Sequence, residues 1–137
     1  MSNSELRWKQ RFLNFQAVFL RLKEGVEQPD LNELERNGLI QRFEFTLELA
    51  WKTLKDFLLG KEFNFKPSPK DTLRLAQQSG YIDFAKDLLD GMALRNELSH
   101  DYSGEKFLES EPEFRTVIYP ALEKLYLFLK SEYDREA

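Results

Sequence analysis

Cysteine is missing from this chain of 137 residues, and histidine occurs only once, as His100. The lack of cysteine excludes a disulfide framework and any zinc site with cysteine ligands. A single imidazole is too little for a mononuclear metal site based on histidine, so the sequence predicts no metal and no cofactor. The lack of cysteine also fits a reducing compartment, and we expect a cytoplasmic protein.

Long apolar runs, glycine and proline are scarce as well. Nowhere do eighteen or more apolar residues follow one another, and the first residues carry no basic segment followed by an apolar run. We therefore expect neither a membrane span nor export. Six glycines and five prolines stand against twelve phenylalanines and two tryptophans, which suits long packed helices better than a turn-rich β fold. Glycine-rich phosphate loops, paired histidines and serine elbows are missing too.

Positive charge is in deficit. The formal net charge is −4, which argues against a protein that binds nucleic acid through a broad basic surface. Any contact with RNA would have to be local. A short lysine cluster, Lys61, Lys66 and Lys70, lies in a predicted loop. Such a cluster is usually just solvated, although a phosphate backbone could rest there.

Apolar residues recur at helical spacing along most of the chain, and no strand alternation persists. The pattern predicts helices over 4–25 and 32–59, a short helix from the cap at Ser68 to 79–80, a helix from about Ile82 or Asp83 to about His100, and a last helix from Pro112 to about Tyr133. Gly60 is predicted to follow the second helix, and Pro120 to kink the last one. By length, residues 1–137 form one domain. The predicted fold class is all-α, an up-and-down helical bundle of four main helices plus one short helix.

The second predicted helix is apolar on more than one side, which makes it the central element of the bundle. One stripe contains Ile40, Phe43, Leu47, Ala50, Leu54 and Leu58, and adjacent faces carry Phe45, Leu49, Trp51 and Phe57. An aromatic residue on such a helix is more often core than binding surface. Trp51 with Lys52 could nevertheless offer a nucleotide a stacking surface and a phosphate contact.

Polar residues appear where an apolar helical stripe continues towards the only histidine. The stripe contains Ile82, Ala85, Leu88, Leu89 and Met92, and its next positions are Arg95, Asn96 and Ser99. Polar groups on a buried face need partners, because an unpaired arginine is expensive to remove from water. We predict a pair between Arg95 and Glu44 or Glu48, which lie one turn apart on the second helix. This segment is the candidate site.

The spacing of Arg95, His100 and Tyr102 at the end of a penultimate long helix resembles the HEPN superfamily. More narrowly, residues 38–55, together with Asn96, resemble the family of nucleotidyltransferase substrate-binding proteins, relatives of the HepT toxins. The resemblance covers nearly the whole chain. It implies a small homodimer that works with a minimal nucleotidyltransferase as its partner.

The resemblance also implies roles for individual residues. In the toxin branch of the family, the arginine and histidine cleave RNA without metal, and the partner attaches AMP to the tyrosine. Carried over, the catalytic roles fall on Arg95 and His100, and the modification site is Tyr102. Supporting positions around them are Asn96, Ser99, Glu44 and Glu48.

Two functions remain open from the sequence. The chain is either an accessory or substrate-binding subunit of the nucleotidyltransferase, or an endoribonuclease toxin that AMP addition to Tyr102 inactivates. The plain structural alternatives are an ion pair for Arg95, a helix-end position for His100 and a packed ring for Tyr102. A two-fold dimer built on the site helix and an aromatic-rich helix face would bring two His100 and two Arg95 side chains together.

Overall fold

The computed structural model describes residues 3–136, and these form helices and their connections without a strand. The helices are α1 (Asn3–Glu27), α2 (Glu33–Gly60), α3 (Pro69–Gln78), α4 (Ala85–Leu98), α5 (Glu105–Glu113), the π-helix η1 (Phe114–Ile118) and α6 (Tyr119–Arg135). The predicted all-α bundle is confirmed. No helix in the described part of the chain is both long and apolar enough to cross a membrane.

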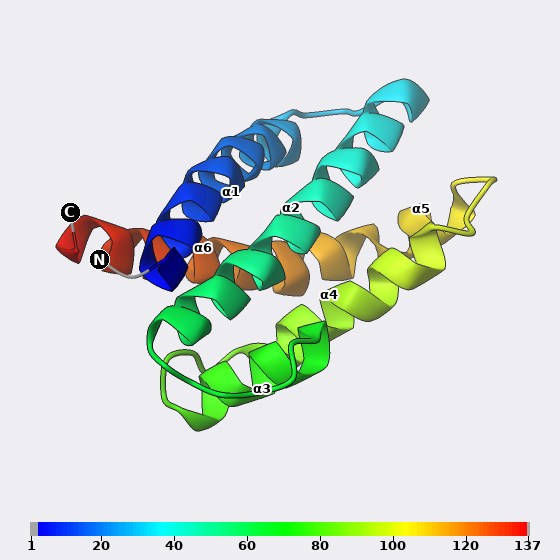
Figure 1. The fold of residues 1–137 in the computed structure, drawn as a ribbon. Coiled ribbons are helices and arrows are strands. Elements are labelled where there is room, and N and C mark those ends of the chain that lie inside the picture. Colours follow the sequence, from blue (N-terminus) through cyan, green and yellow to red (C-terminus); the bar gives the residue numbers. More distant parts are fainter. Residues whose placement is uncertain (1–2, 137) are drawn as a thin grey trace.

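Helix α2 is the centre of the bundle, as its apolar pattern predicted. It contacts α1, α3, α4 and α6. Figure 1 shows α1 and α2 as an antiparallel hairpin, with α4 running back beside α2 in the opposite direction and α6 crossing behind both. The carboxyl end of α4 therefore lies near the amino-terminal half of α2.

The beginnings of α2 and α3 follow from local capping chemistry. The side chain of Asn32 accepts a hydrogen bond from the backbone N–H of Glu35 (2.8 Å), and the Glu35 carboxylate accepts one from the backbone N–H of Asn32 (2.9 Å). At α3 the Ser68 hydroxyl oxygen accepts a hydrogen bond from the backbone N–H of Asp71 (3.1 Å), and Pro69 is the first helical residue. These bonds satisfy amide groups that an isolated helix start leaves unpaired.

The prediction for Gly60 was wrong. Gly60 is the last residue of α2 rather than the residue after it, and Lys61 is the carboxyl cap. The left-handed backbone conformation that favours glycine falls instead on Glu62, with φ of 68°. The helix runs on because the Lys61 backbone N–H still reaches the carbonyl oxygens of Phe57 and Leu58.

The predicted start of the last helix was also wrong. Helical structure begins at Glu105, Pro112 lies inside α5, and the π-helix η1 separates α5 from α6 just before Pro120. The carboxylate of Asp101 explains the early start, because it accepts hydrogen bonds from the backbone N–H groups of Lys106 (3.2 Å) and Phe107 (3.0 Å). This cap comes four residues before the helix, outside the usual capping-box spacing.

The aromatic face of α1 forms much of the core. Its Trp8, Phe12, Phe15 and Phe19 side chains are buried. They pack on α6, where the rings of Phe19 and Tyr126 stack with centroids 4.5 Å apart. Stacked and edge-on ring pairs of this kind add to the stabilisation that burial alone provides.

Candidate functional site

Arg95 on α4 and Glu48 on α2 form an ion pair between the two helices. The Nη1 atom of Arg95 lies 2.9 Å from Oε2 of Glu48. The predicted pair is confirmed, and its carboxylate is Glu48 rather than Glu44. The contact engages one of the three guanidinium nitrogens, and the Arg95 side chain is still 28% exposed. Arg95 is thus held in place while part of its guanidinium faces solvent.

Glu48 is shared by two more groups of α2. Its Oε1 atom lies 2.9 Å from Nζ of Lys52, and its Oε2 atom accepts a hydrogen bond from the Trp51 indole N–H (3.3 Å). Burial acts to raise the pKa of Glu48, but the bonds from Lys52, Trp51 and Arg95 outweigh it and hold that pKa below its ordinary value. The structure therefore joins the two predicted clusters, Arg95 and the Trp51–Lys52 pair, through one ionised carboxylate.

The resulting cluster carries excess positive charge on an otherwise acidic protein. Arg95 and Lys52 share one carboxylate, whereas Lys55, whose Nζ lies 5.9 Å from the centroid of the Trp51 ring, is also paired with Asp56 at 3.6 Å. The half-buried Trp51 ring lies beside these cations, and an aromatic ring is a group on which a base can stack. This is the kind of local feature that contact with a phosphodiester requires in a protein of negative net charge.

The lysine cluster of the predicted loop is less suited to such a contact. Lys61 is partly neutralised, because its Nζ atom lies 3.1 Å from the carboxylate of Glu136. Lys66 and Lys70 are exposed. We therefore interpret these lysines as solvated side chains rather than as a site for a phosphate backbone.

Helix α4 ends before the histidine. Leu98 is its last residue, and His100 lies in the following turn, where its backbone N–H bonds the carbonyl of Glu97 (3.2 Å). In a regular helix His100 would be about 140° around the axis from Arg95. The helix end removes that constraint. The imidazole is exposed, as a group that exchanges protons with a substrate must be.

Asn96 and Ser99 do not lie on a buried face, so that part of the sequence prediction was wrong. Both are exposed, and the buried side of α4 continues through Leu94 and Leu98 instead. The Ser99 hydroxyl donates to the carbonyl of Asn96 (2.7 Å) and so serves the helix end. Asn96 and Ser99 keep the helical spacing of the stripe, so their exposure reflects which side of α4 the neighbouring helices cover near its carboxyl end.

Tyr102 projects from the turn between α4 and α5, and its side chain is 93% exposed. The turn itself is anchored: Asp101 caps α5, and Nζ of Lys106 lies 2.8 Å from Oε2 of Glu97 across the turn. Gly104 closes the turn with φ of 81°, a conformation that a side chain would strain. The phenol is therefore accessible on an ordered support.

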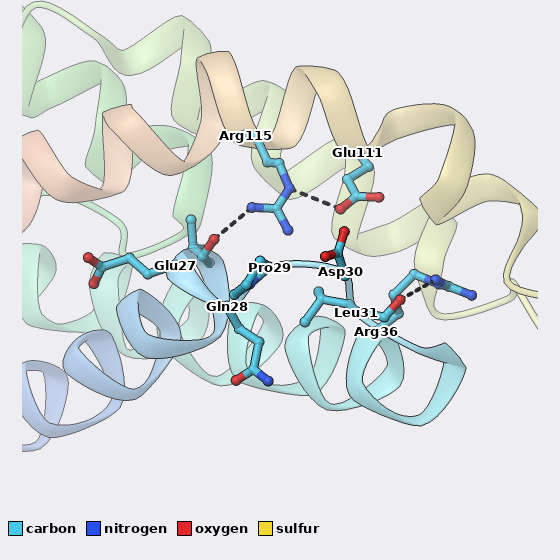
Figure 2. A pocket seen from close by; sticks show the side chains of 9 residues that line it. Glu27, Gln28, Pro29, Asp30, Leu31, Arg36, Glu111 and Arg115 are labelled. Carbon is cyan, nitrogen blue, oxygen red and sulfur yellow. Dashed lines mark hydrogen bonds and ion pairs between the residues drawn. The ribbon is translucent and has the colours of Figure 1, made fainter.

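Two arginines that the sequence interpretation did not consider hold the connection between α1 and α2. Nη1 of Arg115 donates to the carbonyl of Val26 (2.8 Å), and Nη1 of Arg36 donates to the carbonyl of Leu31 (2.7 Å). Both arginines line a recess of about 450 Å³. Figure 2 shows their guanidinium groups there, with Glu111 paired to Arg115. Both arginines bond backbone carbonyls, and Arg115 also bonds a carboxylate. These contacts fix the connection between α1 and α2, so we assign the two arginines a structural role.

The family model of nucleotidyltransferase substrate binding protein like sequences matches residues 10–131. The chain belongs to this family. A crystal structure of a protein from Thermus thermophilus is similar to it, with 29% sequence identity and a TM-score of 0.69 over 87% of this chain and 98% of that one. None of the curated proteins matches.

The Arg95–Glu48 pair predicts a pH-dependent stability difference. Since folding lowers the pKa of Glu48 from its ordinary 4.5, the pair stabilises the fold above that pH and loses its effect as the pH falls through the lowered value. Arg95→Gln is expected to lower the free energy of unfolding by up to about 1 kcal/mol at pH 7; the effect is small because the pair is partly exposed. The cost should shrink towards pH 4 in urea unfolding.

The matched control for this measurement is Lys86→Gln, which removes one side of the more exposed Lys86–Asp90 pair on the same helix. We expect Lys86→Gln to change the free energy of unfolding less than Arg95→Gln does at pH 7, and to change it little at pH 4. An Arg95→Gln cost that stays constant between pH 7 and pH 4 would show that Glu48 is not the group that senses the substitution.

Proposed function

We propose that this chain is the HEPN-type partner subunit of a minimal nucleotidyltransferase, in a cytoplasmic two-component system of the toxin–antitoxin kind. It acts there as the accessory or substrate-binding subunit. Membership of a family named for nucleotidyltransferase substrate binding is the observation that carries the proposal. The acidic net charge also favours a protein partner over a long nucleic acid.

Tyr102 is the residue that the partner would modify. A nucleotidyltransferase must bring the target hydroxyl to the α-phosphate of its nucleotide, and a phenol that is 93% exposed on an anchored turn meets this need. With ATP as donor, the Tyr102 oxygen would bond the α-phosphorus, pyrophosphate would leave, and the phenolic proton would pass to a base.

Co-expression with a nucleotidyltransferase encoded beside this chain tests the partnership. We expect the two proteins to purify together, and mass spectrometry to find the mass of one or more AMP groups on a peptide that contains Tyr102. Tyr102→Phe should remove the added mass and keep the complex, because the ring remains. AMP on Tyr119 or Tyr126 instead would contradict the assignment, and failure to purify together would contradict the partnership.

The alternative function is a metal-independent endoribonuclease. Arg95, which shares Glu48 with Lys52 and Trp51, lies on the helix that ends just before the exposed His100, and this favours it. In such a reaction the 2′-oxygen of the RNA attacks the phosphorus as a base takes its proton, and the 5′-oxygen leaves as an acid protonates it. Arg95 would stabilise the charge that develops on the phosphate. AMP on Tyr102, two residues from His100, would block this site.

A homodimer would supply the second histidine that this mechanism uses. The outer side of α2 exposes Leu34 (80%) and Phe45 (55%), and Phe45 lies three residues before Glu48. A two-fold axis beside this surface duplicates every residue near it, so two Arg95 and two His100 side chains would share one cleft. Covering these apolar side chains favours association.

Light scattering tests the dimer. At micromolar concentration the full chain is expected to have twice the monomer mass, and Phe45→Glu to have the monomer mass, because a charge would be buried in the interface. Leu127→Glu, on the equally exposed Leu127 of α6, should leave the dimer intact. A monomeric wild-type chain would remove both the dimer and the mechanism with two histidines.

A further inference from the structure

Three leucines on the outer side of α1 are exposed at intervals of seven residues. They are Leu6, Leu13 and Leu20, and each side chain is 45–48% exposed. Because one helical turn takes 3.6 residues, this spacing aligns them in one row, which we call the leucine ridge. The leucine ridge lies about 140° around the helix axis from the buried aromatic face. Glu24, one turn beyond Leu20, ends it.

The neighbouring helices leave the leucine ridge uncovered. Helix α1 packs against α2 and α6, and Figure 1 shows it on the outside of the bundle. Towards α2, the guanidinium of Arg11 lies 3.2 Å from the carboxylate of Asp56. Towards α6, Nε2 of Gln16 donates a hydrogen bond to the Tyr126 hydroxyl (2.8 Å). The leucine ridge is on the side of α1 that points away from both contacts, so it faces solvent.

Cations border the leucine ridge on both sides. Arg7 and Arg21 lie along its α2 side, Lys23 lies along its α6 side, and all three are exposed. Within residues 3–136 none of these three side chains forms an ion pair. The other two cations of α1, Lys9 and Arg11, are paired with carboxylates of the residue after α6 and of α2. The outer face of α1 therefore presents uncompensated positive charge beside apolar side chains.

We propose that the leucine ridge docks an acidic amphipathic helix of another protein. In a two-stranded coiled coil, apolar residues repeat every seven positions at d, and charged residues at the flanking e and g positions select the partner. With the leucines at d, Arg7 and Arg21 occupy e positions and Lys23 a g position. A helix with an apolar stripe and glutamates on both flanks would cover the leucines and neutralise these cations. The inference goes beyond the function proposed above, since it requires neither a nucleotidyltransferase nor RNA.

A second copy of this chain fits the leucine ridge poorly. An antiparallel pair of α1 helices would place Arg7 of one copy opposite Arg21 of the other, and Lys9 opposite Lys23. Like charges that face each other across an interface oppose association. A parallel pair would set Arg21 against Gln16 and would supply no carboxylate either. The charges therefore favour an acidic partner over self-association.

An anionic membrane surface also fits the leucine ridge less well than a helix does. Helices that lie in a membrane surface present a broad apolar face with tryptophan, phenylalanine and leucine. In α1 the large aromatic residues point inward, where Trp8 and Phe12 are buried. On the outer face, Gln10 and Ala17 stand between the leucines. A seam this narrow matches the contact line of one helix.

Fluorescence anisotropy with a labelled synthetic peptide tests the proposal. The acidic peptide is about 21 residues long, with isoleucine at a, leucine at d, glutamate at e and g, and alanine or glutamine elsewhere. A second peptide has lysine in place of each glutamate. We expect the full chain to bind the acidic peptide at micromolar concentration, at least about tenfold more tightly than the lysine peptide.

Variants of the chain assign the binding to the leucine ridge. Leu13→Glu should weaken the acidic peptide at least about tenfold, because it places a charge at the centre of the contact. Leu127→Glu, at an exposed leucine of α6, is the matched control and should bind as wild type does. The triple variant Arg7→Glu/Arg21→Glu/Lys23→Glu should reverse the preference between the two peptides. Circular dichroism checks that each variant is folded before titration.

Several outcomes would overturn the proposal. One is no binding of the acidic peptide at about 0.1 mM, and another is binding that Leu13→Glu leaves unchanged. Equal affinity for the two peptides would show that the cations do not select the partner. Binding to phosphatidylserine vesicles in place of the peptide, abolished by Leu13→Glu, would assign the leucine ridge to a membrane. A change from dimer to monomer mass on Leu13→Glu would assign it to a second copy. None of these results depends on whether a nucleotidyltransferase copurifies.

Discussion

Replacing Arg11 with methionine is expected to lower the free energy of unfolding by about 3 kcal/mol, because it leaves a buried carboxylate without its main partner. The Asp56 side chain on α2 is 1% exposed, and its Oδ2 atom lies 3.2 Å from Nε of Arg11 on α1. Lys55 is the second cation, with Nζ 3.6 Å from Oδ1. Among the described residues, neither Asp56 oxygen accepts a well-aligned hydrogen bond. The positive charges of Arg11 and Lys55 therefore provide the stabilisation that offsets the burial of this carboxylate. Urea unfolding followed by circular dichroism measures the loss.

Two further variants make this measurement specific to the pair. Arg7→Met changes an exposed arginine of the same helix and is expected to stay within about 0.5 kcal/mol of wild type. The double variant Arg11→Met/Asp56→Leu should recover most of the lost stability, because apolar residues of similar volume often replace a buried pair at little cost. A loss below about 1 kcal/mol for Arg11→Met would show that Lys55 alone compensates Asp56.

Under the ribonuclease alternative, His100→Ala is expected to lower the rate of RNA cleavage at least about 100-fold, the usual contribution of a group that transfers a proton. The exposed imidazole follows the last residue of α4, so its loss should leave urea unfolding almost unchanged. Arg95→Ala should also lose activity, with a stability cost from the broken pair with Glu48. Cleavage of a labelled RNA in the presence of chelator is the measurement.

Asn14→Ala is the matched control, because it removes an exposed polar side chain from α1, on a different surface. Chelation is expected to leave the rate unchanged, since one histidine per chain offers no usual metal site. Cleavage by His100→Ala at the wild-type rate would refute the role of the imidazole. If expression of this chain alone neither arrests growth nor yields cleavage, the accessory subunit is the function to pursue.

The sequence alone determined most of the helices and the chemistry of their caps. Helical periodicity is a local property, so the apolar stripes predicted α1, α2, α3, α4 and α6 but not α5, and the caps at Asn32 and Ser68 marked two helix starts within a residue. The buried aromatic face of α1 followed from the same spacing. The need of Arg95 for a carboxylate was also predictable, because the cost of an unpaired buried cation does not depend on the fold.

Only the tertiary structure decided which groups meet. The choice of Glu48 over Glu44 depends on how α2 and α4 rotate against each other, a result of side-chain packing across the whole interface. The same rotation exposes Asn96 and buries Leu98. The Arg11–Asp56 pair joins residues 45 positions apart, and a recess at Tyr102 joins residues 33–40 to 101–108. No local pattern encodes such contacts, since they form only when distant segments pack together.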